Sequence, residues 1–312
     1  MRKKIRDFSP SDKAVLVLRL SDIQIKKTTA NADYASMLGF DGTDLIEVKI
    51  WNLTDDKRDI LKNGEVYELS GTMKDYQGKM QFNVSELRLL DDSEIDKSEF
   101  FEYAKMSEED LKQGIVEYMN KIDNPTIKKL VFTALKQFFP DFFKHPAALS
   151  MHHNYIGGLA YHVYSMLKLS DVYLQLYPYL NSSLVYGGII LHDIGKMVEL
   201  SGPKGTEYTK EGNLLGHISI GSNLFYKIAC DLGLEKTDEY LSLQHIILSH
   251  HGLLEYGSPK EPQIPEAVLI HILDFSDSRL AALEKEATNT MPGEYTDPIL
   301  AFSRKRFYKP DL

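Results

Sequence analysis

The pentapeptide HDIGK, residues 192–196, interrupts an apolar run that begins near Leu184. An imidazole beside a carboxylate offers a neutral nitrogen ligand and an anionic oxygen ligand, and the carboxylate can bridge two cations. On a helix, His192, Asp193 and Lys196 would share one face, since positions three and four apart are neighbours there. Taken alone, such a pair is more often a surface feature, so its meaning depends on the rest of the chain.

The length and composition favour a globular protein with more than one domain. The 312 residues exceed the usual size of a single domain, and 43% hydrophobic with 26% charged residues is ordinary for a soluble chain. The charged first segment and the lack of an 18-residue apolar run predict a cytoplasmic protein with no membrane partner. The single cysteine, Cys230, excludes an intramolecular disulfide and is expected in the core.

The net charge of −9 argues against a basic coat for duplex DNA. Residues 1–93 hold 15 Lys and Arg against 16 Asp and Glu, which leaves 21 against 29 for the remainder. An acidic domain can still take a polyanion when bound cations supply local positive charge. Any contact with nucleic acid should therefore be confined to a small surface.

Residues 14–90 have the alternating pattern of short strands, separated by turn signals such as Asp41-Gly42 and Gln77-Gly78. About five short strands in this span predict a small all-β barrel. The segments IEVKIW and VYELSGTMKDYQGKMQFNVSELRLL, in that order, resemble the OB-fold of the tRNA-anticodon-binding type over residues 12–92. The resemblance implies a module that binds nucleic acid.

A barrel of this kind holds single strands by stacking bases on aromatic rings beside a few cations. The predicted contacts are Tyr34, Lys49, Trp51, Tyr76 and Phe82. A place in the barrel core is the alternative for Trp51 and Phe82, and it is the favoured one for Trp51. Tyr76 lies in a Tyr-Gln-Gly turn and is expected on the binding face.

The composition becomes acidic and helical after Asp91, and this shift sets the predicted domain limits. They are an OB-type domain at 1–93, a helical linker at 94–124, an all-α domain at 125–290 and a basic, aromatic tail at 291–312. In the tail, Arg304 and Arg306 are candidate single-strand contacts, with a packed strap as the alternative. His153 is a candidate for the substrate path, or belongs to a loop packed on helix ends.

Potential metal ligands follow one another along the predicted helices: His162, His192, Asp193, His217, His250, His251 and Asp274. This order resembles the HD-domain metal-dependent phosphohydrolases over about residues 125–285. The resemblance implies ligands that project from separate helices into one pocket. Asp277 is a weaker candidate than Asp274 for the last position, and the sequence does not decide between His250 and His251.

A site for one ion needs His162, His192, Asp193 and Asp274, while His217 with His250 or His251 supplies a second ion. Asp193 would bridge two ions that activate water against a phosphodiester, and Lys196 would contact the scissile phosphate. Ligation by imidazole and carboxylate without thiolate favours Mn²⁺, with Mg²⁺ and Fe²⁺ as alternatives.

The motifs GGLAYH, LHDIGK, GHI, LSHHGLLEYGSP and IHILD, behind an OB-type module, resemble the YhaM family of 3′-to-5′ exoribonucleases. The resemblance implies hydrolysis of single-stranded RNA, with single-stranded DNA as a second substrate, to nucleoside monophosphates. The alternatives are a phosphohydrolase or phosphodiesterase acting on nucleotides, and a non-catalytic single-strand-binding protein. Self-association into a homo-oligomer is expected, because repetition strengthens weak contacts.

Overall fold

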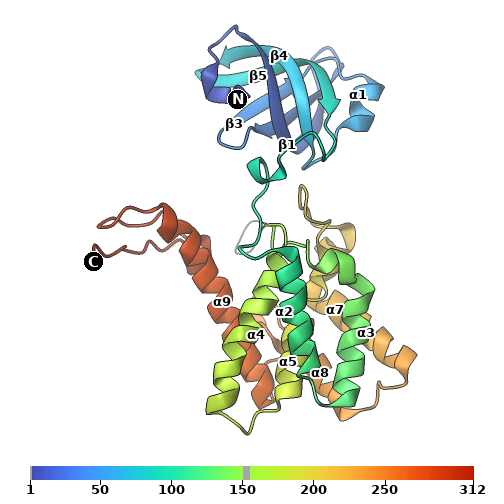
Figure 1. The fold of residues 1–312 in the computed structure, drawn as a ribbon. Helices are drawn as coiled ribbons and strands as arrows, with labels where there is room; N and C mark the ends of the chain where they lie inside the picture. Colours follow the sequence, from blue (N-terminus) through green and yellow to red (C-terminus); the bar gives the residue numbers. More distant parts are fainter. Residues whose placement is uncertain (1, 150–154) are drawn as a thin grey trace. The chain divides into compact units, whose positions relative to one another are not determined.

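The computed structural model describes residues 2–149 and 155–312, so the predicted contact His153 lies outside the described residues. The chain divides into two compact units, one built of strands and the other of helices (Figure 1). The first runs to Glu102 and includes residues 204–206, and the second comprises residues 103–203 and 207–312. The first unit thus extends beyond residue 93, where the change in composition placed its end.

The first unit is a closed five-stranded barrel with the strand order β1-β2-β3-β5-β4. Neighbouring strands are antiparallel except for β3 and β5, which are parallel. This strand order in a closed Greek-key barrel is that of an OB-fold, so the predicted all-β fold is confirmed. The strands are β1 (Lys13–Lys27), β2 (Asp33–Phe40), β3 (Leu45–Ile50), β4 (Val66–Tyr76) and β5 (Lys79–Leu89), with a short helix α1 (Asp55–Ile60) between β3 and β4.

Alternating burial along the strands explains why this segment closes into a barrel. In β1, Ala14, Leu16, Leu18 and Leu20 are buried, and the residues between them are exposed or half-buried. Since successive side chains of a strand point to opposite faces, every second residue joins the interior. Leu69, Met73 and Phe82 fill the same core from β4 and β5.

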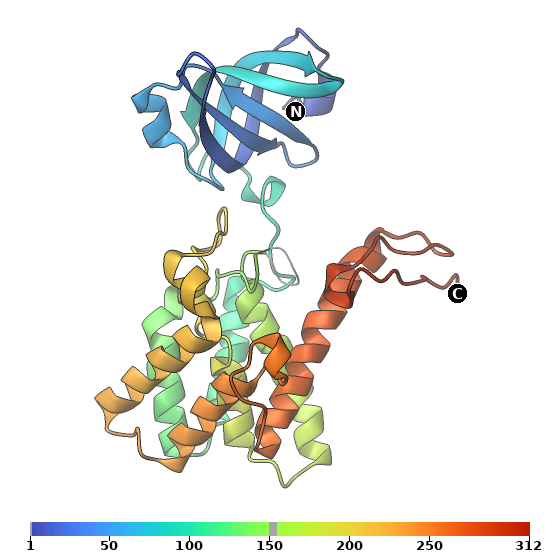
Figure 2. The same cartoon turned by 180° about the vertical axis from the view of Figure 1, so that it is seen from behind.

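The second unit is helical and is built around α5, whose residues from Val185 to Leu191 are all buried. This helix packs against α3, α4, α8 and α9, so it has no face left for solvent. No helix in the described part of the chain has the length and apolar character needed to cross a bilayer. The helices are α2 (Glu108–Asn120), α3 (Pro125–Phe142), α4 (Gly158–Leu176), α5 (Ser182–Leu191), α6 (Lys196–Glu199), α7 (Lys210–Leu232), α8 (Asp238–Ser249) and α9 (Pro265–Asn289) (Figures 1 and 2).

Three details differ from the expectations. Helix α2 packs into the helical core through Leu111 and Ile115, so the second half of residues 94–124 belongs to that core and is not a linker. Cys230 is exposed on α7 and is not a core residue. The tail is folded back as a hairpin, with bridges between Tyr295 and Tyr308 and, farther along, between Ile299 and Lys305.

Candidate metal centre

The predicted ligands come from five places in the helical unit and meet in one cluster. His162 lies in α4, His192 and Asp193 directly follow α5, His217 lies in α7, His250 and His251 follow α8, and Asp274 lies in α9. Of these side chains, His162, His192, Asp193 and His250 are almost completely buried. The folding of these helices around α5 therefore brings together residues that are more than 100 positions apart.

The HDIGK segment forms a tight turn between α5 and α6, so its predicted position within one helix is wrong. The N–H of Ile194 donates to the Leu191 carbonyl over 3.0 Å, and that of Lys196 donates to the Asp193 carbonyl over 2.9 Å. Asp193 and Lys196 are neighbours nonetheless, because residues three apart also meet in such a turn. Lys196 Nζ lies 2.8 Å from Asp193 Oδ2.

Gly195 allows this turn to approach α7. A Cβ atom at Gly195 would lie 1.9 Å from the His217 carbonyl oxygen and 2.7 Å from the Gly221 nitrogen. These distances are far below van der Waals contact, and both atoms belong to backbone. The ligand-bearing turn and α7 can pack this closely only when residue 195 has no side chain.

A kink in α7 aims His217 at the cluster. Gly216 has φ of 69° inside the helix, a conformation that glycine adopts without strain. Beyond this kink, Glu199 Oε1 accepts from the His217 backbone N–H over 2.9 Å and lies 3.2 Å from its Nδ1. Glu199 thus fixes both the backbone and the ring of His217.

The two oxygens of Asp193 face different groups of ligands. Oδ2 lies 3.3 Å from His192 Nε2 and 3.9 Å from His162 Nε2. Oδ1 lies 3.5 Å from His217 Nε2 and 3.6 Å from His250 Nε2. The carboxylate therefore lies between two groups of nitrogen donors.

Each group has the donors for one ion. The ligand atoms of His162, His192 and Asp193 lie within 4.8 Å of one another, as do those of His217, His250 and His251. Asp274 Oδ1 adds to the first group at 3.3 Å from His162 Nε2. The second group contains both His250 and His251, the pair between which the sequence did not decide.

The ring orientations point Nε2 of the histidines toward the cluster, because Nδ1 is held elsewhere. The Nε2 atoms of His192, His217 and His250, and Asp193 Oδ1, are buried and have no hydrogen-bond partner in the described part of the chain. Such groups are costly to bury, and a bound cation removes that cost, so the donor set fits a divalent metal. The Nδ1 contacts are His162 to Asp277 (2.7 Å), His192 to the Ile189 carbonyl (2.7 Å), His217 to Glu199 (3.2 Å), His250 to the Ile247 carbonyl (2.9 Å) and His251 to the Tyr256 carbonyl (2.8 Å).

The electrostatics of the cluster also suit a cation. Burial lowers the pKa of His250 and of His251, which keeps both imidazoles neutral and able to bind metal. Burial acts in the same direction on His162, but hydrogen bonds to Asp274 and Asp277 raise the pKa of His162 to about 10. Without a metal, this ring would hold a proton between carboxylates, and a metal ion can replace that proton.

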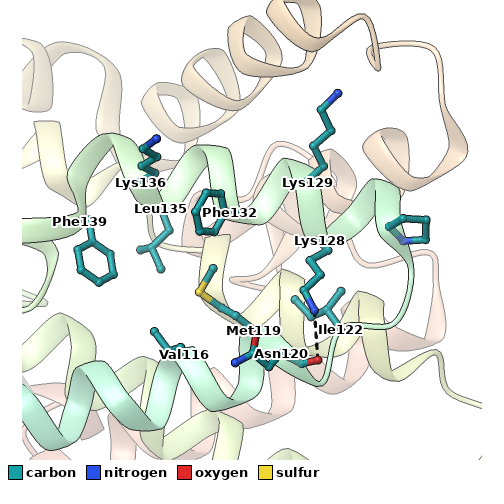
Figure 3. Close-up of a pocket in the computed structure, with 11 residues that line it drawn as sticks. Val116, Met119, Asn120, Ile122, Lys128, Lys129, Phe132, Leu135, Lys136 and Phe139 are labelled. Atoms are coloured by element: carbon teal, nitrogen blue, oxygen red, sulfur yellow. Dashed lines mark hydrogen bonds between the residues drawn. The ribbon is translucent and has the colours of Figure 1, made fainter.

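A cavity of about 360 Å³ opens beside the cluster. Asp193, Lys196, His251 and Asp274 lie in its wall, together with residues of α9 that follow Asp274. A larger groove of about 620 Å³ lies between α2 and α3 and contains none of the predicted site residues. Figure 3 shows that its lining is apolar, with lysines along α3, which does not suit metal chemistry.

Four of the predicted nucleic-acid contacts come together on the barrel. The rings of Tyr34 and Trp51 stack with centroids 4.8 Å apart, and Lys49 Nζ lies 5.6 Å from the Trp51 ring and 5.8 Å from the Tyr76 ring. Trp51 is 44% exposed, so the expectation that it belongs to the core is wrong. Phe82 is fully buried, so its assignment to the binding surface is wrong.

The two arginines of the tail differ in their surroundings. Arg306 Nε donates to the Thr296 carbonyl over 2.8 Å, which ties it into the hairpin. Arg304 is exposed in the turn of the hairpin, with φ of 63°. The Arg306 side chain therefore helps to hold the hairpin together, whereas Arg304 contributes its backbone N–H, which donates to the Ile299 carbonyl over 2.9 Å, and leaves its side chain exposed.

Two acidic residues that the ligand pattern does not mark as partners also act on the cluster. Glu199 holds Nδ1 of His217, and Asp277 holds Nδ1 of His162. The only feature of the sequence that pointed to Asp277 was its position three residues after Asp274, which places both on the same side of a helix. Glu199 offered no such signal, because its contact depends on how α6 packs on α7.

Replacing Asp277 by Ala should weaken metal binding about 10- to 100-fold, since His162 would lose the partner that orients its ring. Asp277→Asn should recover part of the affinity, because an amide oxygen can still accept from Nδ1. Calorimetric titration with Mn²⁺ checks this, with Glu261→Ala, an exposed carboxylate, as the matched control. Unchanged affinity in Asp277→Ala would contradict the orienting role.

Comparison with family models agrees with the architecture of the helical unit. Residues 159–278 match the family model described as HD domain. A solved domain of replication protein A from Methanococcus maripaludis is 23% identical, and the match covers 30% of this chain and 99% of that domain with a TM-score of 0.26. The second OB-fold domain of the same protein is 18% identical over 29% of this chain and 95% of its own length, with a TM-score of 0.24. The assignment of the first unit rests on its strand order and closure, and the chain thus combines an OB-type barrel with an HD domain.

Proposed function

We propose that the chain is a 3′-to-5′ exoribonuclease that hydrolyses single-stranded RNA, and also single-stranded DNA, to nucleoside monophosphates with two divalent ions. The observation that carries the proposal is the position of Asp193, whose two oxygens face two separate groups of nitrogen donors. A bridging carboxylate is the arrangement that holds two ions close enough to act on one phosphoryl group. The direction of hydrolysis follows from the resemblance to the YhaM exoribonucleases.

The first ion would be held by His162, His192, Asp193 and Asp274, and the second by Asp193 with His217, His250 and His251. When bound, the ions supply a nucleophile at neutral pH and offset the charge of the phosphoryl group. Mn²⁺ is the favoured ion, because the donors are imidazoles and carboxylates.

Lys196 would act on both the metal centre and the substrate. Its ammonium group, 2.8 Å from Asp193 Oδ2, keeps that carboxylate oriented. Burial lowers the pKa of Lys196, but the neighbouring Asp193 outweighs it and raises the pKa overall, so the charge is retained. Because Lys196 also lies in the cavity wall, it can offset the charge that develops on the scissile phosphate.

The barrel would hold the strand that the helical unit shortens. Tyr34, Trp51 and Tyr76 offer ring faces around Lys49, which is the combination that binds single strands without reading sequence. These residues lie at the β2–β3 face and near the β4–β5 turn, where OB-folds bind oligonucleotides. Arg304 is a further candidate contact on the tail.

Hydrolysis of a 5′-labelled single-stranded RNA in the presence of Mn²⁺ tests the proposal. A ladder of products that shortens from the 3′ end, with nucleoside monophosphates released, is the expected result, and chelation should abolish it. A panel of free nucleotides serves as the comparison, because an HD phosphohydrolase for small substrates has no need of the barrel. Turnover of the free nucleotides alone would overturn the exoribonuclease assignment.

Replacing Trp51 by Ala should weaken the binding of a single-stranded RNA about 5- to 150-fold, since one stacked base is worth about 1–3 kcal/mol. Hydrolysis of a dinucleotide should be unchanged, because it depends on the cavity alone. Fluorescence anisotropy checks binding, with the exposed Tyr179→Ala as the control. Equal losses on the long and the short substrate would mean that the barrel has only a structural role.

A further inference from the structure

One face of α9 lies along the cavity of the metal centre. His271, Asp274, Phe275, Ser278 and Arg279 all contribute to the cavity wall. Their spacing is that of positions i, i+3, i+4, i+7 and i+8, which form a single stripe on a helix. Asp274 belongs to the metal cluster, and Arg279 lies about 7.5 Å farther along the helix axis, at 1.5 Å per residue.

Arg279 is held in place by two aromatic rings. Its guanidinium carbon lies 4.7 Å from the centroid of Phe275 and 5.0 Å from that of Phe302. Phe302 belongs to the short helix η4 (Leu300–Phe302) of the tail and packs edge-on against Phe307, with centroids 4.7 Å apart. The tail hairpin thus helps to form the wall of the site and supports Arg279.

Two aromatic rings lie against the guanidinium, while its hydrogen-bonding groups have no partner among the residues that the structure describes. Neither a hydrogen bond nor an ion pair joins Arg279 to another residue in the described ranges. A planar, oriented guanidinium with unused donors in a cavity suits an oxyanion, which it can bind through two parallel hydrogen bonds. Lysine could not replace it, because an ammonium group is a point charge without this fork.

We propose that Arg279 binds the phosphate one nucleotide to the 5′ side of the scissile phosphodiester, an inference that rests on the proposed exoribonuclease function. The scissile phosphate would be served by Lys196 and the metal cluster, and Arg279 lies in the same cavity wall, five residues or about 7.5 Å of helix rise beyond the ligand Asp274. A strand cleaved from its 3′ end carries its next phosphate only on the 5′ side. The Arg279 subsite therefore selects substrates with at least two phosphates.

The dinucleotides pApA and ApA separate this subsite from the reaction itself, since both contain the same scissile bond and only pApA has the additional phosphate. Wild-type protein with Mn²⁺ should hydrolyse pApA with a kcat/KM about 10- to 100-fold above that for ApA. Arg279→Ala should lose this preference while its activity on ApA stays within about twofold of wild type. Lys168→Ala, which removes an exposed charge of α4, is the control and should keep the preference.

Arg279→Lys provides a second variant if Arg279→Ala does not fold, as judged by its melting temperature. It keeps the charge and loses the fork, so it should lose most of the preference for pApA. An unchanged preference, or an equal loss on both dinucleotides, overturns the phosphate subsite while leaving the exoribonuclease assignment intact. Failure of the wild type to hydrolyse either dinucleotide or a longer RNA overturns the proposed function and this inference with it.

Discussion

Replacement of Asp193 by Ala is expected to remove both metal ions and to lower hydrolysis more than about a thousandfold. The oxygens of this carboxylate lie between both groups of histidines, so neither ion would keep its complete set of ligands without it. Activation by metal is worth several kcal/mol of transition-state stabilisation, and each 1.36 kcal/mol corresponds to a factor of ten in rate. Loss of both ions should therefore lower the rate of hydrolysis more than the removal of one orienting residue such as Asp277.

Metal analysis of the purified variant and a time course on labelled RNA measure the two parts of this result. Binding of single-stranded RNA should persist, because the barrel surface around Trp51 is unaffected. Asp231→Ala, which removes an exposed carboxylate of α7, is the matched control for charge. Full turnover by Asp193→Ala with two ions retained would contradict the bridging role.

The cluster was expected because the order of the ligands along the chain resembles that of the HD-domain phosphohydrolases, and that resemblance implies ligands that meet in one pocket. His162, His217 and Asp274 lie on α4, α7 and α9, and the apolar runs between them are typical of separate helices. The barrel was predictable as well, since strands of alternating burial leave a period-two signal in the sequence.

Residues at the ends of elements were harder to predict. Trp51 follows the last residue of β3, where the alternation that would place its side chain inside or outside no longer applies. Phe82 alternates with the polar residues Gln81 and Asn83 in β5 and shares its face with the buried Val84, so its burial follows the period-two pattern, and its assignment to the surface went against that pattern. The pattern of strands therefore predicts that the barrel carries an aromatic surface, but it is less reliable for the individual residues that belong to this surface.

Contacts between helices were the least predictable part. The roles of Glu199, Asp277 and Arg279 each depend on a partner from another helix or from the tail, and acidic and basic residues are too common on helices to mark such roles. The stacking of Phe302 on Arg279 gives the tail a place in the cavity wall. The sequence had instead predicted that the clustered charges of the tail contact nucleic acid directly.

Gly195→Ala is the substitution with the next largest expected effect, although residue 195 contacts neither metal nor substrate. The new methyl group would lie 1.9 Å from the His217 carbonyl oxygen. No rotamer change can relieve a contact with backbone, so the turn and α7 must move apart. Asp193 Oδ1 and His217 Nε2, now 3.5 Å apart, would separate with them, and the second ion should be lost first. Overpacking of this kind costs about 1–3 kcal/mol, and the contact with backbone places Gly195→Ala at the upper end of that range.

The matched control for this substitution is Gly187→Ala in α5, where the nearest atoms to the new methyl group are side-chain methyl groups, of Ile127 and Val131 at 3.0 Å and of Leu243 at 3.4 Å. These side chains can adjust, and alanine favours the helix by about 1 kcal/mol over glycine. Thermal unfolding combined with metal titration should therefore separate the variants: Gly195→Ala should bind the second Mn²⁺ at least about 100-fold more weakly, while Gly187→Ala keeps both ions. If Gly195→Ala bound two ions as wild type does, the close approach of the turn to α7 would not be what positions His217. The comparison thus tests whether the glycine of the HDIGK segment is required by the geometry of the metal centre.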